Sequence, residues 1–453
     1  MESKKFICGV AEGFYGRPWS ATQRHELFRL MRSWGMNTYL YAPKDDVKHR
    51  TLWRAPYSGA EAIMLQTLIR DCRGKGLAFV YSIAPGLDLA YSSRKDLAVL
   101  RKKISQLLDL NCRRFAILFD DIHPVLSPAD ARQFGSIAAA QSFVANELLG
   151  FVRSRVADAT LCFCPTQYCG KMSGPPGDSG YLKEIGRLLE PSIQIFWTGP
   201  EIISEAITVE SIRELRRAIW RKPLLWDNLH ANDYDLRRIY LGPYSGRSLE
   251  LREEISGVLS NPNCEFEANY IPLRTLAMYA RAKDRWNPRH AFRTALSGWL
   301  AQWKTHAPAT ISSGEVELFC DCFYLPAEFG GQARHFLDDF RFLLRTPPKG
   351  WGGTLRRFER TCVKLIALID KMNSLKNRGL LFALYRHGWE LREEVQLLGH
   401  YVRWLQTNRG AEKAFVSPDR RPKIYRGGLV AELQRLLPMD EQGRFHARLP
   451  AQP

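Results

Sequence analysis

Short apolar runs and amphipathic segments alternate eight times along the first 270 residues, and this alternation constrains the fold more than any other feature. Each run is rich in β-branched and aromatic residues, as buried strands are, and the segments between the runs have helical periodicity. Helices are expected, for example, at residues 21–34, 95–110 and 207–220. The eight expected strands begin near residues 6, 37, 77, 114, 160, 193, 223 and 255.

Eight strand–helix units in succession are typical of a (β/α)8 barrel. A doubly wound open sheet would show the same alternation. That alternative is disfavoured because no G-x-G-x-x-G motif follows the first strand. We therefore predict an α/β fold, a (β/α)8 TIM barrel.

Past residue 310 the sequence changes to the pattern of long helices. Apolar residues recur at spacings of three and four from Leu355 to Met372 and from Leu381 to Leu405, with Gly388 as the one gap. This pattern predicts two helices joined near residues 373–379. The small and polar residues 305–315 indicate a linker. We therefore expect a barrel domain at 1–304, a linker at 305–315 and an α-helical bundle at 316–453.

The composition disfavours several classes of partner. Of the formal net charge of +18, about +12 falls in residues 281–453, but these cations are spread along helices, so no nucleic-acid partner is expected. No stretch reaches 18 apolar residues, so no membrane span is expected. The ten cysteines form no CxxC pair, and the first residues lack the apolar core of a signal peptide. A reducing compartment is therefore expected.

Polar residues follow most of the expected strands, where a barrel gathers its functional groups. Taken singly, a carboxylate after a strand is often a helix cap or half of a surface ion pair. Convergence of these polar residues on the carboxyl-terminal mouth of the barrel would instead indicate an active site. The residues are Glu12 and Gly13, Lys44 and Asp45, Asp120 and Asp121, Tyr168, Thr198, Asp227 and Asn228, and Asn261.

The adjacent carboxylates of Asp120 and Asp121 are the most informative of these. Both can reach one cavity only if the strand before them stops or bulges. Their proximity would raise the proton affinity of one, and glycoside hydrolysis needs such a pair of one acid and one anion. Metal-assisted hydrolysis is the alternative, but His123 and His230 stand alone and no HxH is present. We therefore expect no metal and no cofactor.

The segments that carry these residues resemble the O-GlcNAcases of glycoside hydrolase family 84, which remove β-linked N-acetylglucosamine from serine and threonine of proteins. A looser similarity over residues 318–440 is to the helical stalk domain of the animal enzymes, which implies a homodimer. The motifs are "CGVAEGFYGRPW" (8–19), "YLYAPKDDVKHR" (39–50), "FAILFDDI" (115–122), "FCPTQYCG" (163–170), "WTGP" (197–200), "WDNLHANDYD" (226–235) and "NPNCEFEANY" (261–270).

The resemblance implies substrate assistance, in which the 2-acetamido oxygen of the sugar is the nucleophile and an oxazoline is the intermediate. Asp120 would orient the acetamido N–H, and Asp121 would act as general acid and then as general base. The other implied roles are in binding. Gly13, Lys44, Asp233 and Asn261 would bind hydroxyls, Tyr168 and Asn228 the acetamido group, and Cys164, Thr198 and Trp226 would wall its methyl pocket.

The resemblance thus implies an enzyme that acts on O-GlcNAc-modified proteins in the cytoplasm and nucleus. Two alternatives stay open. One is a catalytically silent module that uses the same barrel to recognise a sugar or an acidic partner. The other is a secreted hexosaminidase or hyaluronidase-like enzyme, which the missing signal peptide and disulfides disfavour.

Overall fold

The structure is a computed structural model that describes residues 6–409, 413–416, 427–437 and 439–446. The chain forms two compact units. The first, the barrel unit, comprises Met1–Asp233, Tyr244–Phe266 and Leu273–Pro288. The second, the helical unit, comprises Tyr234–Pro243, Glu267–Pro272 and Arg289–Pro453. The expected boundary near residue 304 stays a prediction.

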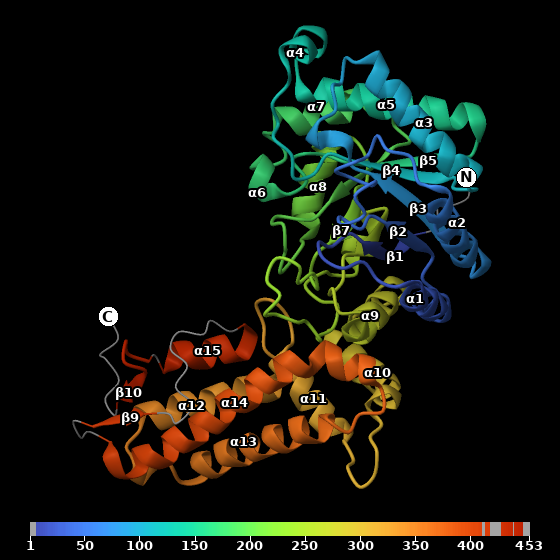
Figure 1. The fold of residues 1–453 in the computed structure, drawn as a ribbon. Helices are drawn as coiled ribbons and strands as arrows, with labels where there is room; N and C mark the ends of the chain where they lie inside the picture. Colours follow the sequence, from blue (N-terminus) through green and yellow to red (C-terminus); the bar gives the residue numbers. More distant parts are fainter. Residues whose placement is uncertain (1–5, 410–412, 417–426, 438, 447–453) are drawn as a thin grey trace. The chain divides into compact units, whose positions relative to one another are not determined.

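Eight parallel strands close into a barrel in sequence order, and helices surround it (Figure 1). The predicted (β/α)8 fold is confirmed, and each strand lies within the run that predicted it. The strands are β1 (Ile7–Glu12), β2 (Thr38–Tyr41), β3 (Ala78–Ile83), β4 (Arg114–Leu118), β5 (Thr160–Cys164), β6 (Gln194–Trp197), β7 (Leu224–Asp227) and β8 (Gly257–Ser260).

The helices of the barrel unit begin and end at residues that the sequence marks. Helix α1 starts after Ser20, whose side chain forms a capping box with Gln23, and it stops at Gly35, where φ is +77°. The helices in the connections are α1 (Ala21–Trp34), α2 (Gly59–Gly74), α3 (Arg94–Asp109), α4 (Pro128–Phe134), α5 (Ile137–Arg155), α6 (Gly170–Ser173), α7 (Gly180–Leu188), α8 (Val209–Ile219) and α9 (Tyr270–Arg281), with short 3₁₀ turns η1 (Pro85–Leu87), η2 (Glu250–Glu253) and η3 (Phe266–Asn269).

An apolar cluster fills the inside of the barrel. Small and medium side chains dominate it, and all of its members are almost fully shielded from water. Close strand packing also requires a residue without a side chain at Gly9, because a Cβ there would lie 1.7 Å from the carbonyl oxygen of Thr38. The inward residues include Ala11, Leu40, Ala42, Val80, Ala116, Leu118, Cys162, Phe196, Leu224, Trp226 and Leu259.

The helical unit contains the predicted pair of long helices. Gly388, the gap in the apolar pattern, lies where a Cβ would be 3.6 Å from Phe319 and 3.7 Å from Ile369, so neighbouring side chains approach the backbone closely there. A small antiparallel pair, β9 with β10, was not predicted. The elements are α10 (Pro288–Trp299), η4 (Leu300–Trp303), α11 (Ser313–Cys322), α12 (Gly331–Arg345), η5 (Pro348–Gly350), α13 (Gly352–Met372), α14 (Arg378–Asn408), β9 (Ala414–Val416), α15 (Gly428–Leu436) and β10 (Arg444–His446).

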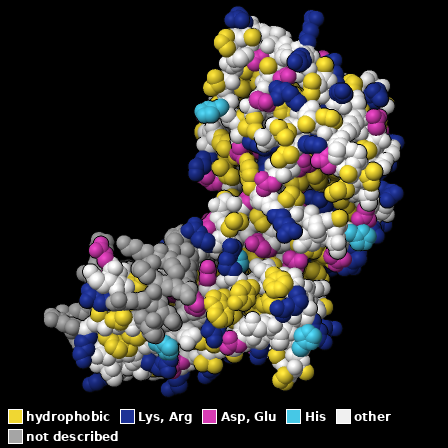
Figure 2. All heavy atoms as spheres, viewed as in Figure 1, with side chains coloured by type: hydrophobic (Ala, Val, Ile, Leu, Met, Phe, Trp, Pro, Cys, Tyr) yellow, Lys and Arg dark blue, Asp and Glu magenta, His cyan; other side chains and the backbone are white. Residues whose placement is uncertain are grey.

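Surface charge and hydropathy agree with the composition. Figure 2 shows Lys and Arg side chains dispersed over the visible face of each unit. No helix in the described part of the chain is both long enough and apolar enough to cross a bilayer. All ten cysteines carry free thiols, and nine of them are buried.

Candidate active site

Strand alternation decides which residues reach the mouth of the barrel. Side chains two positions apart on an extended chain share a face, so the residue two positions beyond an inward-facing one points to the same interior. Eight of the eleven predicted site residues hold such a position after Ala11, Ala42, Leu118, Cys162, Phe196, Leu224, Trp226 or Leu259. The eight are Gly13, Lys44, Asp120, Cys164, Thr198, Trp226, Asn228 and Asn261.

Asp120, after β4, is held by a cation from the loop that follows β2, two strands away in the barrel. Its Oδ2 accepts a hydrogen bond from Lys44 Nζ, and only 3% of the Lys44 side chain and 13% of the Asp120 side chain are exposed. Burial works to raise the pKa of Asp120, but Lys44 and the charge of Arg50 outweigh it, so the pKa lies below its ordinary value. Asp120 Oδ1 is buried, and no described residue donates to it. The site therefore presents a fixed anion with one free acceptor.

Asp121 faces the mouth because the backbone turns sharply at this residue. Strand β4 ends at Leu118, and φ of Asp121 is +52°, in the left-handed region. For most residues with a Cβ this conformation costs roughly 1–2 kcal/mol, and aspartate is among the residues that adopt it more often. The turn lets Tyr168 donate to Oδ1 over 2.8 Å and Tyr15 donate to Oδ2 over 2.9 Å. The predicted end of the strand is confirmed, and it gives both neighbouring carboxylates partners around the mouth.

The two tyrosines remain hydrogen-bond donors in this setting. Burial, and then the negative charge of Asp121, raise the pKa of both Tyr15 and Tyr168 well above the usual range. Tyr168 was a predicted site residue, whereas Tyr15 was not, although it lies within the motif at residues 8–19. Its place three residues after β1 was the available signal.

Arg50 is a site residue that the sequence did not indicate. Its guanidinium donates to the backbone carbonyl of Asp120 over 3.4 Å and to that of Asp121 over 3.0 Å. It comes from the loop between β2 and α2 and is 7% exposed. Its contacts are to backbone atoms of another loop, which residue spacing cannot reveal.

Two amides form a chain beside the pair. Asn228 Nδ2 donates to the Ile202 carbonyl over 2.8 Å, and Asn261 Nδ2 donates to Asn228 Oδ1 over 2.9 Å. Since the Ile202 carbonyl can only accept, it fixes the orientation of both amides. Asn261 Oδ1 is buried and accepts nothing from the described residues. The amide chain therefore leaves an acceptor on Asn261 and a second N–H on Asn228.

Trp226, Gly13 and Cys164 form an apolar side of the site. The Trp226 ring meets Phe196 edge to face with centroids 5.4 Å apart, and a Cβ on Gly13 would lie 2.1 Å from that indole. Only glycine fits this approach of ring to backbone. Cys164 is buried, and burial raises the pKa of its thiol far above the usual range, so it behaves as a small apolar side chain.

The remaining two predicted residues are tied to loops. Thr198 Oγ1 donates to the Glu201 carbonyl over 2.9 Å, so its hydroxyl braces its own loop. Asp233 Oδ2 accepts from the backbone N–H of Tyr15 over 2.9 Å. This contact brings the end of the "WDNLHANDYD" motif to the segment that follows β1.

The expectation that all of the polar strand ends converge on the mouth is wrong for Glu12 and Asp227. Each immediately follows an inward-facing residue, so alternation turns it toward the surrounding helices and loops. Glu12 receives two hydrogen bonds from Arg24, at 2.8 and 2.6 Å. Asp227 receives two from Arg247, at 2.8 Å each. Both carboxylates are therefore structural.

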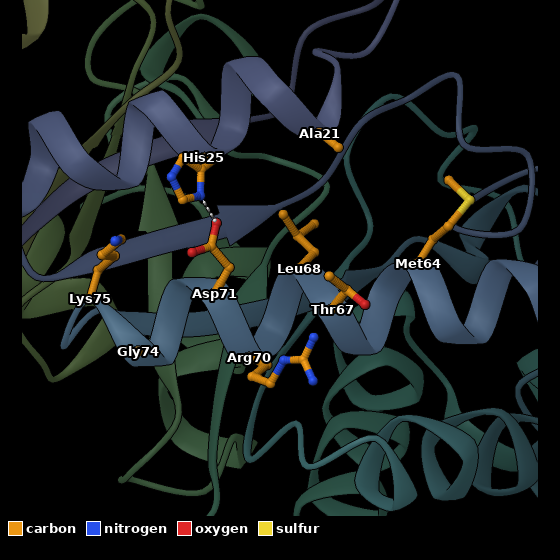
Figure 3. Close-up of a pocket in the computed structure, with 9 residues that line it drawn as sticks. All are labelled: Ala21, His25, Met64, Thr67, Leu68, Arg70, Asp71, Gly74 and Lys75. Carbon is orange, nitrogen blue, oxygen red and sulfur yellow. Dashed lines mark hydrogen bonds and ion pairs between the residues drawn. The ribbon is translucent and has the colours of Figure 1, made fainter.

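A second hollow lies outside the barrel, between α1 and α2 (Figure 3). His25 on α1 points to Asp71 on α2, with Nδ1 and Oδ2 2.9 Å apart. No residue of the motifs that carry the predicted site lines it. Among the residues that the structure describes, no group of three His, Cys, Asp or Glu side chains could hold a metal ion.

Comparison with known proteins places the chain in a family. Residues 8–312 match the family model described as beta-N-acetylglucosaminidase. The chain is 30% identical to protein O-GlcNAcase of Rattus norvegicus, over 97% of this chain and 70% of the relative. A solved mutant of the Thermobaculum terrenum O-GlcNAc hydrolase is 26% identical with a TM-score of 0.80, covering 89% of this chain and 84% of that one. The solved protein CpGH84B is also 26% identical, with a TM-score of 0.77 over 88% of this chain and 69% of that one. The chain therefore belongs to glycoside hydrolase family 84, the beta-N-acetylglucosaminidases of the O-GlcNAcase type.

Proposed function

We propose that the chain removes O-linked N-acetylglucosamine from serine and threonine of proteins by a retaining, substrate-assisted mechanism. One observation carries the proposal. Asp120 is an ion-paired carboxylate with a free buried oxygen, whereas Asp121, the next residue, is turned to the mouth and held by two phenols. The two acids thus have different environments, which fits different roles.

In the first step, the acetamido carbonyl oxygen attacks the anomeric carbon, and the bond to the serine or threonine oxygen breaks. Asp121 gives its proton to that leaving oxygen. Asp120 accepts the acetamido N–H at Oδ1 and stabilises the positive charge that develops on the nitrogen. The low pKa of Asp120 supports this role because it keeps the group an anion. The product of the step is an oxazoline whose nitrogen keeps its proton, an oxazolinium ion beside the Asp120 carboxylate.

In the second step, the Asp121 carboxylate accepts a proton from water, and the water oxygen attacks the anomeric carbon. The bond between this carbon and the oxazoline oxygen breaks, and the acetamido group is restored. Two inversions give net retention. Tyr15 and Tyr168 support both steps because they keep the Asp121 carboxyl oriented.

The other side chains are proposed to bind the sugar. Lys44, Gly13, Asp233 and Asn261 serve its hydroxyls, and the free Oδ1 of Asn261 is a suitable acceptor. The second N–H of Asn228, together with Tyr168, serves the acetamido group. Trp226, Cys164 and Thr198 line the pocket for the acetamido methyl group. The apolar packing around Trp226 supports this assignment.

The test is release of N-acetylglucosamine from a β-O-GlcNAc peptide by the purified chain in the presence of a chelator. We expect turnover, and ¹H NMR should show the β-anomer of the free sugar forming first. A chain that binds the glycopeptide without turnover would be the silent module. A preference for hexosamine polymers over glycopeptide would favour the hexosaminidase-like alternative.

We further propose that residues 316–453 form a stalk that pairs two chains into a homodimer. An exposed aromatic stripe on α14 supports this, since Phe382, Tyr385 and Trp389 are 71%, 46% and 37% exposed. Sedimentation should give a dimer for the chain and a monomer for a Phe382→Glu, Trp389→Glu variant. We also propose that the chain acts in the cytoplasm and nucleus, and the location of tagged protein in cells would test this.

A further inference from the structure

We propose that Arg50 is a positioning residue that clamps the turn carrying Asp120 and Asp121, so that two neighbouring carboxylates can face one mouth. This inference rests on the proposed function for its kinetic consequences. Its structural basis is independent, since one guanidinium binds two consecutive backbone carbonyls.

The turn needs such a clamp because Asp121 leaves the path of the strand. If the extended backbone of β4 continued past Leu118, Asp120 would point inward and Asp121 outward. The left-handed φ of +52° brings Asp121 to Tyr15 and Tyr168 instead. A residue with a Cβ adopts this conformation less readily than glycine, although aspartate tolerates it better than most, so contacts that hold the turn stabilise it.

Arg50 provides that enforcement from a rigid base. The residue before it, His49, donates its backbone N–H to the Asp46 carbonyl over 2.9 Å and accepts from Ala84 N–H over 2.9 Å. The His49 ring nitrogen Nδ1 lies 2.8 Å from the Ser82 carbonyl. These bonds lock the loop onto β3 and the segment that follows it, and β3 is the strand paired with β4. The clamp is therefore anchored beside the strand whose end it controls.

The same loop holds Asp120 in a second way. Lys44 binds the Asp120 side chain, while Arg50 binds the Asp120 backbone. No carboxylate in the described part of the chain lies within salt-bridge distance of Arg50, so its charge is not neutralised by a bonded partner. The Arg50 charge lowers the pKa of Asp120. Arg50 thus acts on both position and charge.

Three variants separate these two actions. Arg50→Met removes both, Arg50→Lys keeps the charge with N–H donors on a single nitrogen, and Arg50→Gln keeps an amide donor group without the charge. Arg54→Met is the matched control, because Arg54 lies in the same loop but binds Asp88 and Asp96, which are not among the site residues. Each is assayed on an aryl β-N-acetylglucosaminide with a poor leaving group and on one with an activated leaving group, across pH, with thermal melting as a check of folding.

In Arg50→Met, Asp121 should leave the mouth, and kcat on the poor leaving group should fall about 100-fold with less loss on the activated one. KM should change little. In the Arg50→Gln variant, kcat should depend on the leaving group as it does in the wild type. The acid limb of its pH–rate profile should lie at higher pH, because the Arg50 charge that lowers the pKa of Asp120 is lost. In Arg50→Lys the acid limb should stay at its wild-type pH and kcat should fall moderately. In Arg54→Met kcat should stay within about twofold of the wild-type value, since Arg54 touches no reacting group.

The pH dependence can also reflect the other charged or titratable groups that face Asp120. These groups are Lys44, Arg50, His49, Tyr15, Tyr168, Cys164 and Asp121.

Equal losses on both substrates without a shift of the acid limb would overturn the inference. If Arg50→Met does not melt cooperatively, the Arg50→Lys and Arg50→Gln variants test the inference by the same two measurements, the dependence of kcat on the leaving group and the position of the acid limb. A crystal structure of a folded Arg50 variant tests the clamp independently of activity. A negative φ at Asp121 in Arg50→Met, with the turn kept in Arg50→Gln, supports the clamp, and an unchanged turn in Arg50→Met refutes it. Failure of the wild-type chain to release N-acetylglucosamine would instead refute the proposed function and leave this structural reading intact.

Discussion

Two acids at the ends of barrel strands, Asp227 after β7 and Asp120 after β4, have opposite surroundings. Asp227 is 1% exposed, and both of its oxygens are occupied: Oδ2 by Tyr244 and Arg247, each at 2.8 Å, and Oδ1 by Arg247 at 2.8 Å and the Leu229 N–H at 3.1 Å. Asp120 has one cation on Oδ2 and no described donor on Oδ1.

The difference teaches how to tell a structural carboxylate from a functional one in this protein. An unsatisfied buried acceptor is costly, and protein interiors rarely keep one. Asp227 avoids this cost completely, and Asp120 does not. A buried carboxylate that keeps an unused lone pair at the mouth of a barrel is suited to a substrate N–H, whereas a saturated one stabilises the fold.

The largest expected effect is at Asp121, on the functional side of the comparison. Asp121→Ala should lower glycopeptide turnover by about 10³–10⁴-fold, because the leaving serine oxygen needs a proton. An aryl glycoside with an activated leaving group should lose far less. Asp120→Asn should instead lose similar factors on both substrates. The same leaving-group dependence in the two variants would refute the assigned roles.

Lys44→Met should affect activity more than folding. Loss of the ion pair should lower kcat by about 10²-fold, comparable to removal of one preorganised donor. Asp120 must be ionised, and its pKa now lies below the ordinary value of about 3.9. Without Lys44 this pKa rises, so the acid limb of kcat should move to higher pH. A pH–rate profile measures this, and an unmoved limb would contradict the pairing.

Arg247→Met should affect folding more than activity. It leaves Asp227 buried without its cation, so the free energy of unfolding should fall by about 3–5 kcal/mol. The kcat of the folded enzyme should change only slightly, because Arg247 is turned away from the mouth. Urea unfolding together with active-site titration separates the two quantities. If kcat falls and the free energy of unfolding does not change, Asp227 cannot be distinguished from Asp120 as a structural carboxylate.

The helical unit tests whether an unpartnered buried atom alone indicates function. Neither ring nitrogen of His387 in α14 has a well-formed hydrogen bond within the described residues. Burial and then the charge of Arg386 lower its pKa to about 4, against a weaker opposing effect of the Arg237 backbone. Below the ordinary His pKa of about 6.5 the unfolded chain binds a proton that the folded chain does not, so stability should be lost between about pH 6.5 and 4 with a slope of up to about 1.4 kcal/mol per pH unit. His387→Leu should flatten this slope in unfolding experiments at several pH values.

The smallest effect is expected at the hollow between α1 and α2 (Figure 3). The His25 side chain is 57% exposed, so its pair with Asp71 is screened by water. Asp71→Asn should change the free energy of unfolding by about 0.5 kcal/mol or less and leave kcat unchanged. A large loss of activity would show that this hollow, and not only the mouth, serves the reaction.

Much of the barrel and its site could be predicted because both depend on a period of two. The apolar runs located all eight strands, and the residues two positions past the inward-facing ones included Lys44, Asp120 and Asn261. The same period, applied strictly, would have excluded Glu12 and Asp227, which follow inward residues by one position. Tyr15 and Arg50 could not be identified in this way because they act across loops.

The sequence by itself determined the order of the strands, the amphipathic hairpin of α13 and α14, and the adjacency of Asp120 and Asp121, since these follow from local periodicity and covalent neighbourhood. Only the tertiary structure decided which carboxylates are saturated, and that Asp121 adopts a left-handed turn beneath the Arg50 guanidinium. Those properties depend on hydrogen bonds between segments tens of residues apart, whose free energies no local pattern encodes.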